Sequence, residues 1–131
     1  MSHHREEFRV EGLPEPFSHY TDAVRAGGLL FVSGIVPIDA EGNLVGADDV
    51  AKQARQVFRN MDLCLKAAGC GFEDVVKVVH YLTDVDDRPK INPVRIEFFG
   101  DARPASTLVE VSALVVPGAL LEIEAVAAIP E

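Results

Sequence analysis

The sequence is poor in cysteine and has no apolar run long enough to cross a membrane. Its two cysteines, Cys64 and Cys70, are too few for a disulfide framework and belong to no cluster with metal-ligand spacing. Apolar runs such as Ala113 to Val116 fall far short of the ~20 residues that a membrane helix needs. No apolar segment typical of a secretory signal follows the polar first residues. We therefore expect a soluble protein of the reducing cytoplasm.

Basic residues are also scarce, with 12 Lys and Arg against 21 Asp and Glu and a formal net charge of −9. This balance argues against a nucleic-acid partner, because Lys and Arg supply most of the affinity for phosphates. It also argues against a membrane partner, because an anionic lipid surface would repel the chain. Hydrophobic residues make up 48% of the sequence and are spread along it, which argues against disorder. We expect a single domain over residues 1–131.

Several catalytic and metal-binding motifs are missing from the sequence. It has no phosphate-cradling glycine loop, no His-Glu-x-x-His and no Cys-x-x-Cys, and we give the His3-His4 pair no weight as a metal site. The nearest match to a Gly-x-Ser-x-Gly nucleophile elbow is Val32-Ser33-Gly34, which lacks the first glycine. The sequence therefore points to none of these chemistries.

Three side chains that could react are better explained as structural. His80 lies in an apolar strand on the face that we assign to Val76, Val78 and Leu82, which favours a core histidine bonded to backbone. Cys64 falls on the apolar face of a predicted helix. Cys70 lies between two glycines in a predicted loop, where we expect exposure but see no activating cation beside it.

What the sequence does contain is a regular series of strands and helices. Apolar residues at spacings of three and four predict a long helix, and β-branched runs and turn residues predict strands. The predicted elements are a hairpin of 22–26 and 29–33 around Gly27-Gly28, a helix over 47–68, a strand over 75–82, a helix from 86–89 to Phe99, and strands over 106–111 and 120–127.

This order indicates an α+β protein in which a sheet carries two helices on one face. In the last strand, Leu121, Ile123 and Ala125 face one way, whereas Glu122 and Glu124 face the other. The sheet face away from the helices still carries many apolar residues. Because such a face would be an association liability in a monomer, we expect an oligomer whose sheets pack together.

The polar groups that could form a site are few and mostly neutral. Glu122, in a mostly apolar strand, either belongs to a site or interface or lies at a solvated edge, and the residues alone leave this open. Ser33, Asn92, Ser106 and Thr107 could orient a small polar ligand, but none has a base beside it in the sequence.

A series of segments in collinear order resembles the RidA/YjgF family. The likeness begins with Tyr20, Gly27-Gly28 and Phe31 to Pro37 and continues to the end of the chain through Gln53, Asn60, 67–69, 74–77, Asn92, 97–99, 104–105 and 122–127. The resemblance implies a chorismate-mutase-like fold, a homotrimer whose sheets line a central barrel, and three clefts between neighbouring subunits. It also implies hydrolysis of small reactive enamines or imines to ammonia and a keto product, without a metal or cofactor.

By the same resemblance, Glu122, Tyr20 and Ser33 are the catalytic candidates, with substrate contacts from Asn92, Ser106 and Thr107. The arginine that follows the Pro-Ala pair in the deaminases, and binds the substrate carboxylate, does not map: Ser106 stands there, and Leu108 stands where a cysteine is common. Arg95 is three residues after Asn92 and so shares its helical face, which makes it either a substitute or an ordinary exposed arginine. Strand alternation would place Arg103 on the face opposite Ser106.

Three functions stay open from the sequence. The first is a Rid-family hydrolase that lacks the usual arginine. The second is a catalytically inactive trimer of the same fold with a small-molecule-binding or regulatory role. The third, RNA cleavage, is disfavoured by the net charge of −9.

Overall fold

The fold is built on one mixed β-sheet. The computed structural model describes residues 5–131, so that His3 and His4 lie outside it, and within this range six strands pair in the order β1-β2-β3-β6-β4-β5. The β4–β5 pair is parallel and the other pairs are antiparallel. The strands are β1 (Arg5–Phe8), β2 (Ala23–Ala26), β3 (Leu29–Ile35), β4 (Val75–Leu82), β5 (Ala105–Glu110) and β6 (Leu121–Ala128).

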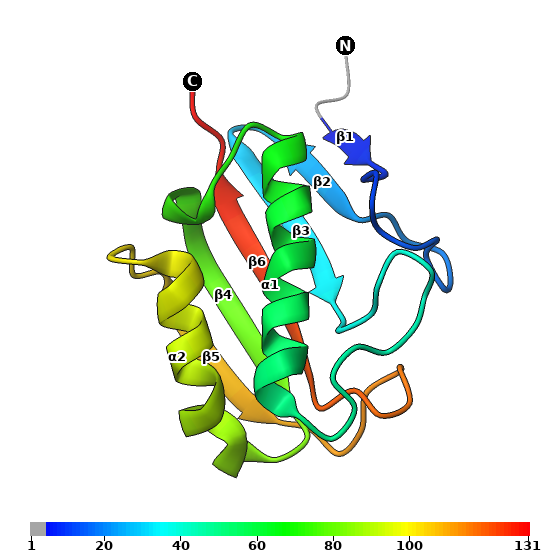
Figure 1. Cartoon of the computed structure of the whole chain (residues 1–131). Coiled ribbons are helices and arrows are strands. Elements are labelled where there is room, and N and C mark those ends of the chain that lie inside the picture. Colours follow the sequence, from blue (N-terminus) through cyan, green and yellow to red (C-terminus); the bar gives the residue numbers. More distant parts are fainter. Residues whose placement is uncertain (1–4) are drawn as a thin grey trace.

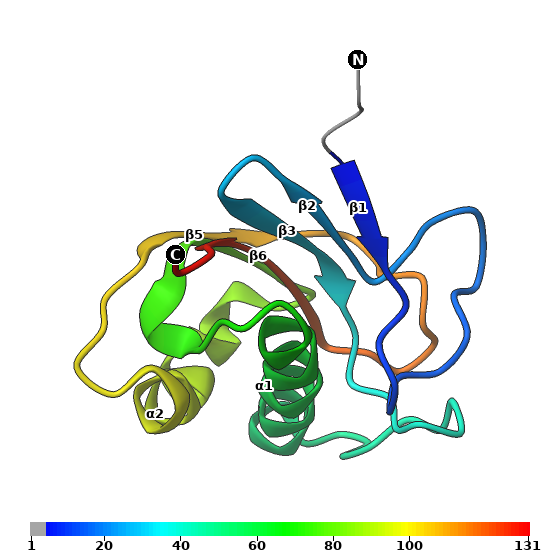
Figure 2. The same cartoon turned by 90° about the horizontal axis from the view of Figure 1, so that it is seen from above.

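Two α-helices, α1 (Val50–Ala67) and α2 (Arg88–Phe99), cover one face of this sheet (Figure 1). The view from above shows both helices on the same side of the strands, with the other side of the sheet uncovered (Figure 2). Short 3₁₀ turns at Phe72–Asp74 and Val85–Asp87 lead into β4 and α2. The predicted α+β architecture is therefore confirmed. In residues 5–131, no helix is both long and apolar enough to cross a membrane.

The local sequence at each end of helix α1 explains where the helix begins and ends. Asp49 is the N-cap and accepts a hydrogen bond from the backbone of Lys52. The helix starts three residues later than predicted, because Asp48 has a left-handed φ of 61° and Asp49 is extended. At the other end Gly69 has a φ of +78°, and Cys70 N donates to Leu65 O at 2.8 Å in a Schellman-type cap.

Three details of the fold differ from the predictions. Strand β1 was not predicted, because Arg5–Phe8 is charged and exposed and pairs only with β2. Val76 does not share the face of His80; it is exposed, because the pairing of β4 with β6 shifts register between Val75 and Lys77. Cys70 is buried rather than exposed, because the cap of α1 turns it back toward the core.

The sheet face away from the helices carries apolar and carboxylate side chains. Leu29, Phe31 and Val109 on this open face are 38%, 45% and 39% exposed. The predicted alternation in β6 is confirmed, with Leu121, Ile123 and Ala125 buried beneath the helices. The open face fits the predicted oligomer in its chemistry, and the trimer stays a prediction.

Candidate functional site

A cavity of about 260 Å³ lies where β3 ends beside β6. It brings together three of the predicted site residues, Tyr20, Ser33 and Glu122, from a loop and two strands that are far apart in the sequence. Its other lining residues are Phe17, Ser18, Gly34, Val36 and Val115. We call this the Glu122 cavity.

Gly34 lets the Glu122 side chain approach the backbone of β3. A Cβ at position 34 would overlap the Glu122 carboxylate, so that glycine is the residue that fits. The β3–β6 pairing shifts register between Val32 and Ile35, which opens the strand at this point. Burial, and then the charge of Glu124, raise the pKa of the Glu122 carboxyl above its ordinary value. A carboxyl of this kind can hold and release a proton nearer neutral pH than a solvated one.

Two of the hydroxyl groups that line the cavity, those of Tyr20 and Ser33, bond to the backbone. Ser33 Oγ donates to the carbonyl of Thr21 at 2.6 Å, which leaves its oxygen able to accept a hydrogen bond. The hydroxyl of Tyr20 accepts from the backbone N–H of Phe17 at 3.2 Å, so that its own proton is free to donate. Tyr20 thus offers a donor to the cavity, and Ser33 an acceptor.

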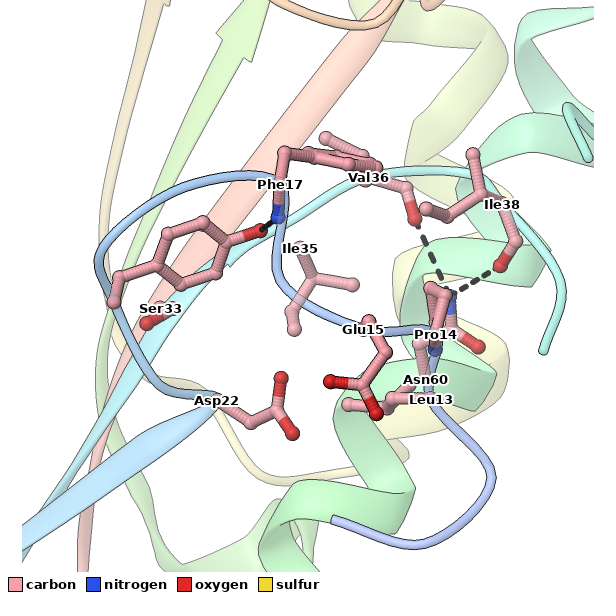
Figure 3. A pocket seen from close by; sticks show the side chains of 12 residues that line it. Leu13, Pro14, Glu15, Phe17, Asp22, Ser33, Ile35, Val36, Ile38 and Asn60 are labelled. Carbon is pink, nitrogen blue, oxygen red and sulfur yellow. Dashed lines mark hydrogen bonds between the residues drawn. The ribbon is translucent and has the colours of Figure 1, made fainter. Parts of the chain in front are cut away.

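Buried amide side chains on α1 support the segments around this cavity. Asn60 donates to the carbonyls of Val36 and Ile38 at 3.2 Å and 2.8 Å (Figure 3). Gln53 donates to Gly46 O at 3.1 Å and Gly118 O at 3.0 Å, and accepts from the backbone of Leu120 at 2.7 Å. No role was predicted for these amides from the sequence. Two polar residues seven apart on the buried side of a helix were the signal that pointed to them.

A second group of predicted residues meets at the edge formed by α2 and β5. The Arg95 guanidinium donates to Ser106 Oγ at 3.0 Å, and Arg95 is partly buried. Burial lowers the pKa of Arg95 from its ordinary value. The arginine on the helix thus contacts Ser106, the strand position where the resemblance leads us to expect an arginine.

Arg95 also lines an open hollow of about 520 Å³, which we call the Arg95 hollow. Arg103 lines it as well; because β5 begins only at Ala105, strand alternation does not extend to Arg103. The lining residues are Asn92, Arg95, Ile96, Phe99, Gly100, Asp101, Ala102, Arg103 and Pro104. Asn92 and Arg95 share this hollow, as their predicted common helical face suggests.

Thr107 lies apart from this pair. Its hydroxyl accepts from Lys77 Nζ at 2.7 Å on the open face of the sheet, opposite the face of Ser106. Its carbonyl lies 2.9 Å from His80 Nδ1, which confirms the prediction of a buried histidine bonded to backbone. Burial lowers the pKa of His80 to about 4. His80 Nε2 has no hydrogen-bond partner within residues 5–131.

Apart from Thr107, the predicted site residues therefore form two separate groups in one chain. As described for residues 5–131, the Glu122 cavity and the Arg95 hollow have no lining residue in common. Over the same residues, no group of three His, Cys, Asp or Glu side chains could hold a metal ion.

A mixed sheet with two helices on one face, and a carboxyl, a tyrosine and a serine around one cavity, define a protein of the Rid type. The solved structure of RidA from the Antarctic bacterium Psychrobacter sp. matches with a TM-score of 0.88 and 32% identity, covering 95% of this chain and 99% of that one. The family model described as Endoribonuclease L-PSP matches residues 11–129. The chain belongs to the RidA/YjgF family.

Two curated relatives carry activity names. The 3-aminoacrylate deaminase RutC of Acinetobacter baylyi is 40% identical over 117 residues, which cover 89% of this chain and 92% of that protein. The human 2-iminobutanoate/2-iminopropanoate deaminase is 35% identical over 114 residues, which cover 87% of this chain and 82% of that protein. At the level of the family, these relatives support imine deaminase chemistry.

Proposed function

We propose that the protein is a cytoplasmic Rid-family hydrolase that converts a small reactive enamine or imine into ammonia and a keto product. The observation that carries the proposal is the half-buried Glu122, whose pKa is raised, in one cavity with Tyr20 and Ser33. The deaminase names of the two relatives add to it.

In this proposal Glu122 moves the protons. Its protonated carboxyl donates to the enamine carbon, which gives an iminium ion, and the carboxylate then takes a proton from the water that adds to the imine carbon. The same proton passes to the amine nitrogen, ammonia leaves, and Glu122 accepts the proton of the remaining hydroxyl as the carbonyl forms. The sum is one enamine and one water converted into one ketone and one ammonia. Tyr20 would orient the water or the substrate by donating, and Ser33 by accepting.

The substrate-binding part of the proposal depends on a homotrimer. In a trimer with sites between subunits, the Arg95 hollow of one chain would face the Glu122 cavity of its neighbour, with Asn92, Ser106 and Thr107 near the substrate. Arg95, with Ser106 bonded to it, would supply the guanidinium that binds a substrate carboxylate. The apolar open face supports such an assembly, because it exposes Leu29, Phe31 and Val109.

The second candidate function is regulatory: a catalytically inactive trimer would bind a small molecule. The observation that favours it is Ser106 itself, which carries no charge where the deaminases carry an arginine. The family model's name refers to an endoribonuclease, but a net charge of −9 disfavours binding to RNA.

The test is ammonia release from enzymatically generated 2-aminoacrylate, measured with purified protein and with the Glu122→Gln variant. We expect acceleration over buffer by the wild type and loss of it in Glu122→Gln, with both proteins equally folded by circular dichroism. No acceleration by an intact wild-type oligomer would reject the deaminase. Stabilisation of the same protein by a keto acid in a thermal-shift assay would then favour the binding function.

A further inference from the structure

A carboxylate and a tyrosine outside the Glu122 cavity are placed to control its proton. Glu124 follows Glu122 by two residues on β6, so that both side chains lie on the open face of the sheet. Tyr81 on β4 is the direct cross-strand partner of Glu122. Its hydroxyl donates to Glu124 Oε1 at 2.6 Å. The three side chains therefore form one connected group across two neighbouring strands.

Within residues 5–131 of one chain, the groups that line the cavity around Glu122 include no cation to offset Glu124; in the proposed trimer, the substrate-binding Arg95 would come from the neighbouring chain. From β3 it faces Ser33 and Gly34, from the loop before β2 it faces Tyr20, and from the loop before β6 it faces Val115. On β4 the nearest cation is Lys77, which lies opposite Val126 and donates to Thr107 Oγ1 at 2.7 Å. Among the described residues that line the cavity there is no lysine or arginine. Glu124 is thus the charge that acts on Glu122 within the chain.

We propose that Glu124 and Tyr81 are positioning residues for Glu122: the hydrogen bond from Tyr81 holds Glu124 on the same face of the sheet, so that a second carboxylate lies beside the acid and disfavours its ionisation. The inference rests on the proposed function, in which Glu122 first acts as an acid. An acid that ionises less readily suits the enamine of the proposed function, whose carbon must accept a proton before water can add.

Tyr81 and Glu124 act on Glu122 in two steps. First, the hydrogen bond that Tyr81 donates holds the Glu124 side chain on the open face of the sheet, which is also the face of Glu122. An ionised carboxylate then disfavours ionisation of a second one close by, in agreement with the direction of the Glu122 pKa. The bond to Glu124 also raises the pKa of Tyr81, so that this hydroxyl remains a donor through the neutral range.

The direct test is a carbon-13 NMR titration of the Glu122 carboxyl, assigned by its loss in Glu122→Gln. We expect Glu122 to titrate at lower pH in Glu124→Gln than in the wild type, and to shift in the same direction by less in Tyr81→Phe. Glu6→Gln removes an exposed negative charge from β1, at the far edge of the same sheet, and should leave the Glu122 titration unchanged. An unchanged titration in folded Glu124→Gln overturns the proposal. If that variant does not fold, an unchanged titration in Tyr81→Phe does so.

The pH dependence of turnover gives the catalytic readout. Activity that needs a protonated Glu122 falls as the pH rises through its pKa, so this fall should move to lower pH in both variants. A shifted Glu122 titration in a protein with no deaminase activity would support the role of Glu124 and Tyr81 and reject the proposed function. Full deaminase activity of the wild type, with an unshifted Glu122 titration in the variants, would support the proposed function and reject the role of Glu124 and Tyr81.

Discussion

At the scale of single residues, Gly34 and Glu122 show how a missing methyl group shapes the candidate site. The carboxylate occupies the space where any other residue at position 34 would place its Cβ. The same contact limits where the carboxylate can lie, because β3 stands directly against it. Glycine at this point thus contributes to the position of the acid, besides its role in the strand.

We predict that Gly34→Ala lowers the deaminase turnover by about 100-fold, because the new methyl group displaces Glu122 from its working position. Gly28→Ala is the matched control. Gly28 lies in the β2–β3 turn, where an added Cβ meets nothing within 4 Å. The measurement is kcat for ammonia release, with the melting temperature of each variant. Equal turnover in the two variants would contradict the role given to Gly34.

We predict that Arg95→Gln raises KM for a carboxylate-bearing substrate by about 10- to 100-fold, the value of one charge-assisted hydrogen bond. Arg88→Gln removes an exposed arginine from the first position of the same helix and should leave KM unchanged. Steady-state kinetics of the two variants separate these outcomes. A KM in Arg95→Gln equal to that of the wild type would show that Arg95 does not bind the substrate carboxylate.

His80 makes stability depend on pH. Because its folded pKa of about 4 lies below the ordinary value of 6.5, the unfolded chain binds a proton first. The free energy of unfolding should therefore fall as the pH drops from 6.5 to 4, by about 3 kcal/mol in total from this residue. Urea unfolding at several pH values, compared with His80→Asn, isolates the effect. Parallel pH curves for the two proteins would refute it.

At the scale of elements, the sequence predicts best what is periodic. Helix α1 follows from apolar residues at spacings of three and four, and β4 from a run of β-branched residues, and both were placed within a few residues. Strand β1 could not be predicted, because its residues pair at an edge and bury almost nothing. The exposure of Val76 and burial of Cys70 depend on a register shift and a helix cap, which no local pattern shows.

The candidate site, too, was predicted only in part from the sequence. The resemblance predicted that Tyr20, Ser33 and Glu122 belong together, and helical phase placed Arg95 with Asn92. The bond from Tyr81 to Glu124 depends on how β4 and β6 align, which is a long-range property. Gln53 and Asn60 likewise bind carbonyls of segments that only the fold brings to α1.

We predict that Gln53→Leu lowers the free energy of unfolding by at least about 2 kcal/mol, because three backbone groups lose their hydrogen-bond partner on the buried Gln53 side chain. Gln56→Leu, one turn further along α1, loses a single close bond, to Asn60 at 2.9 Å, and should cost less. Chemical denaturation of both variants makes the comparison. An equal loss in the two would mean that the contacts of Gln53 carry no special weight.

At the scale of the whole molecule, the open face of the sheet decides how the chain associates. We predict that Phe31→Glu prevents the trimer and abolishes deaminase activity while the chain keeps its secondary structure, because a charge would enter an apolar interface. Val85→Glu, an exposed apolar residue on the turn before α2, is the control. Light scattering and circular dichroism report the two properties. A trimeric Phe31→Glu would place the interface elsewhere.

The separation of the Glu122 cavity from the Arg95 hollow has a genetic consequence. In the proposed trimer each site takes its acid from one chain and its guanidinium from the next, so a chain damaged at Glu122 still carries a sound Arg95 and the reverse is also true. A trimer that contains both kinds of mutant chain would have one interface at which an intact Glu122 of one chain meets an intact Arg95 of the next. The two defects would therefore complement each other when carried by different chains, and would not do so when carried by the same chain.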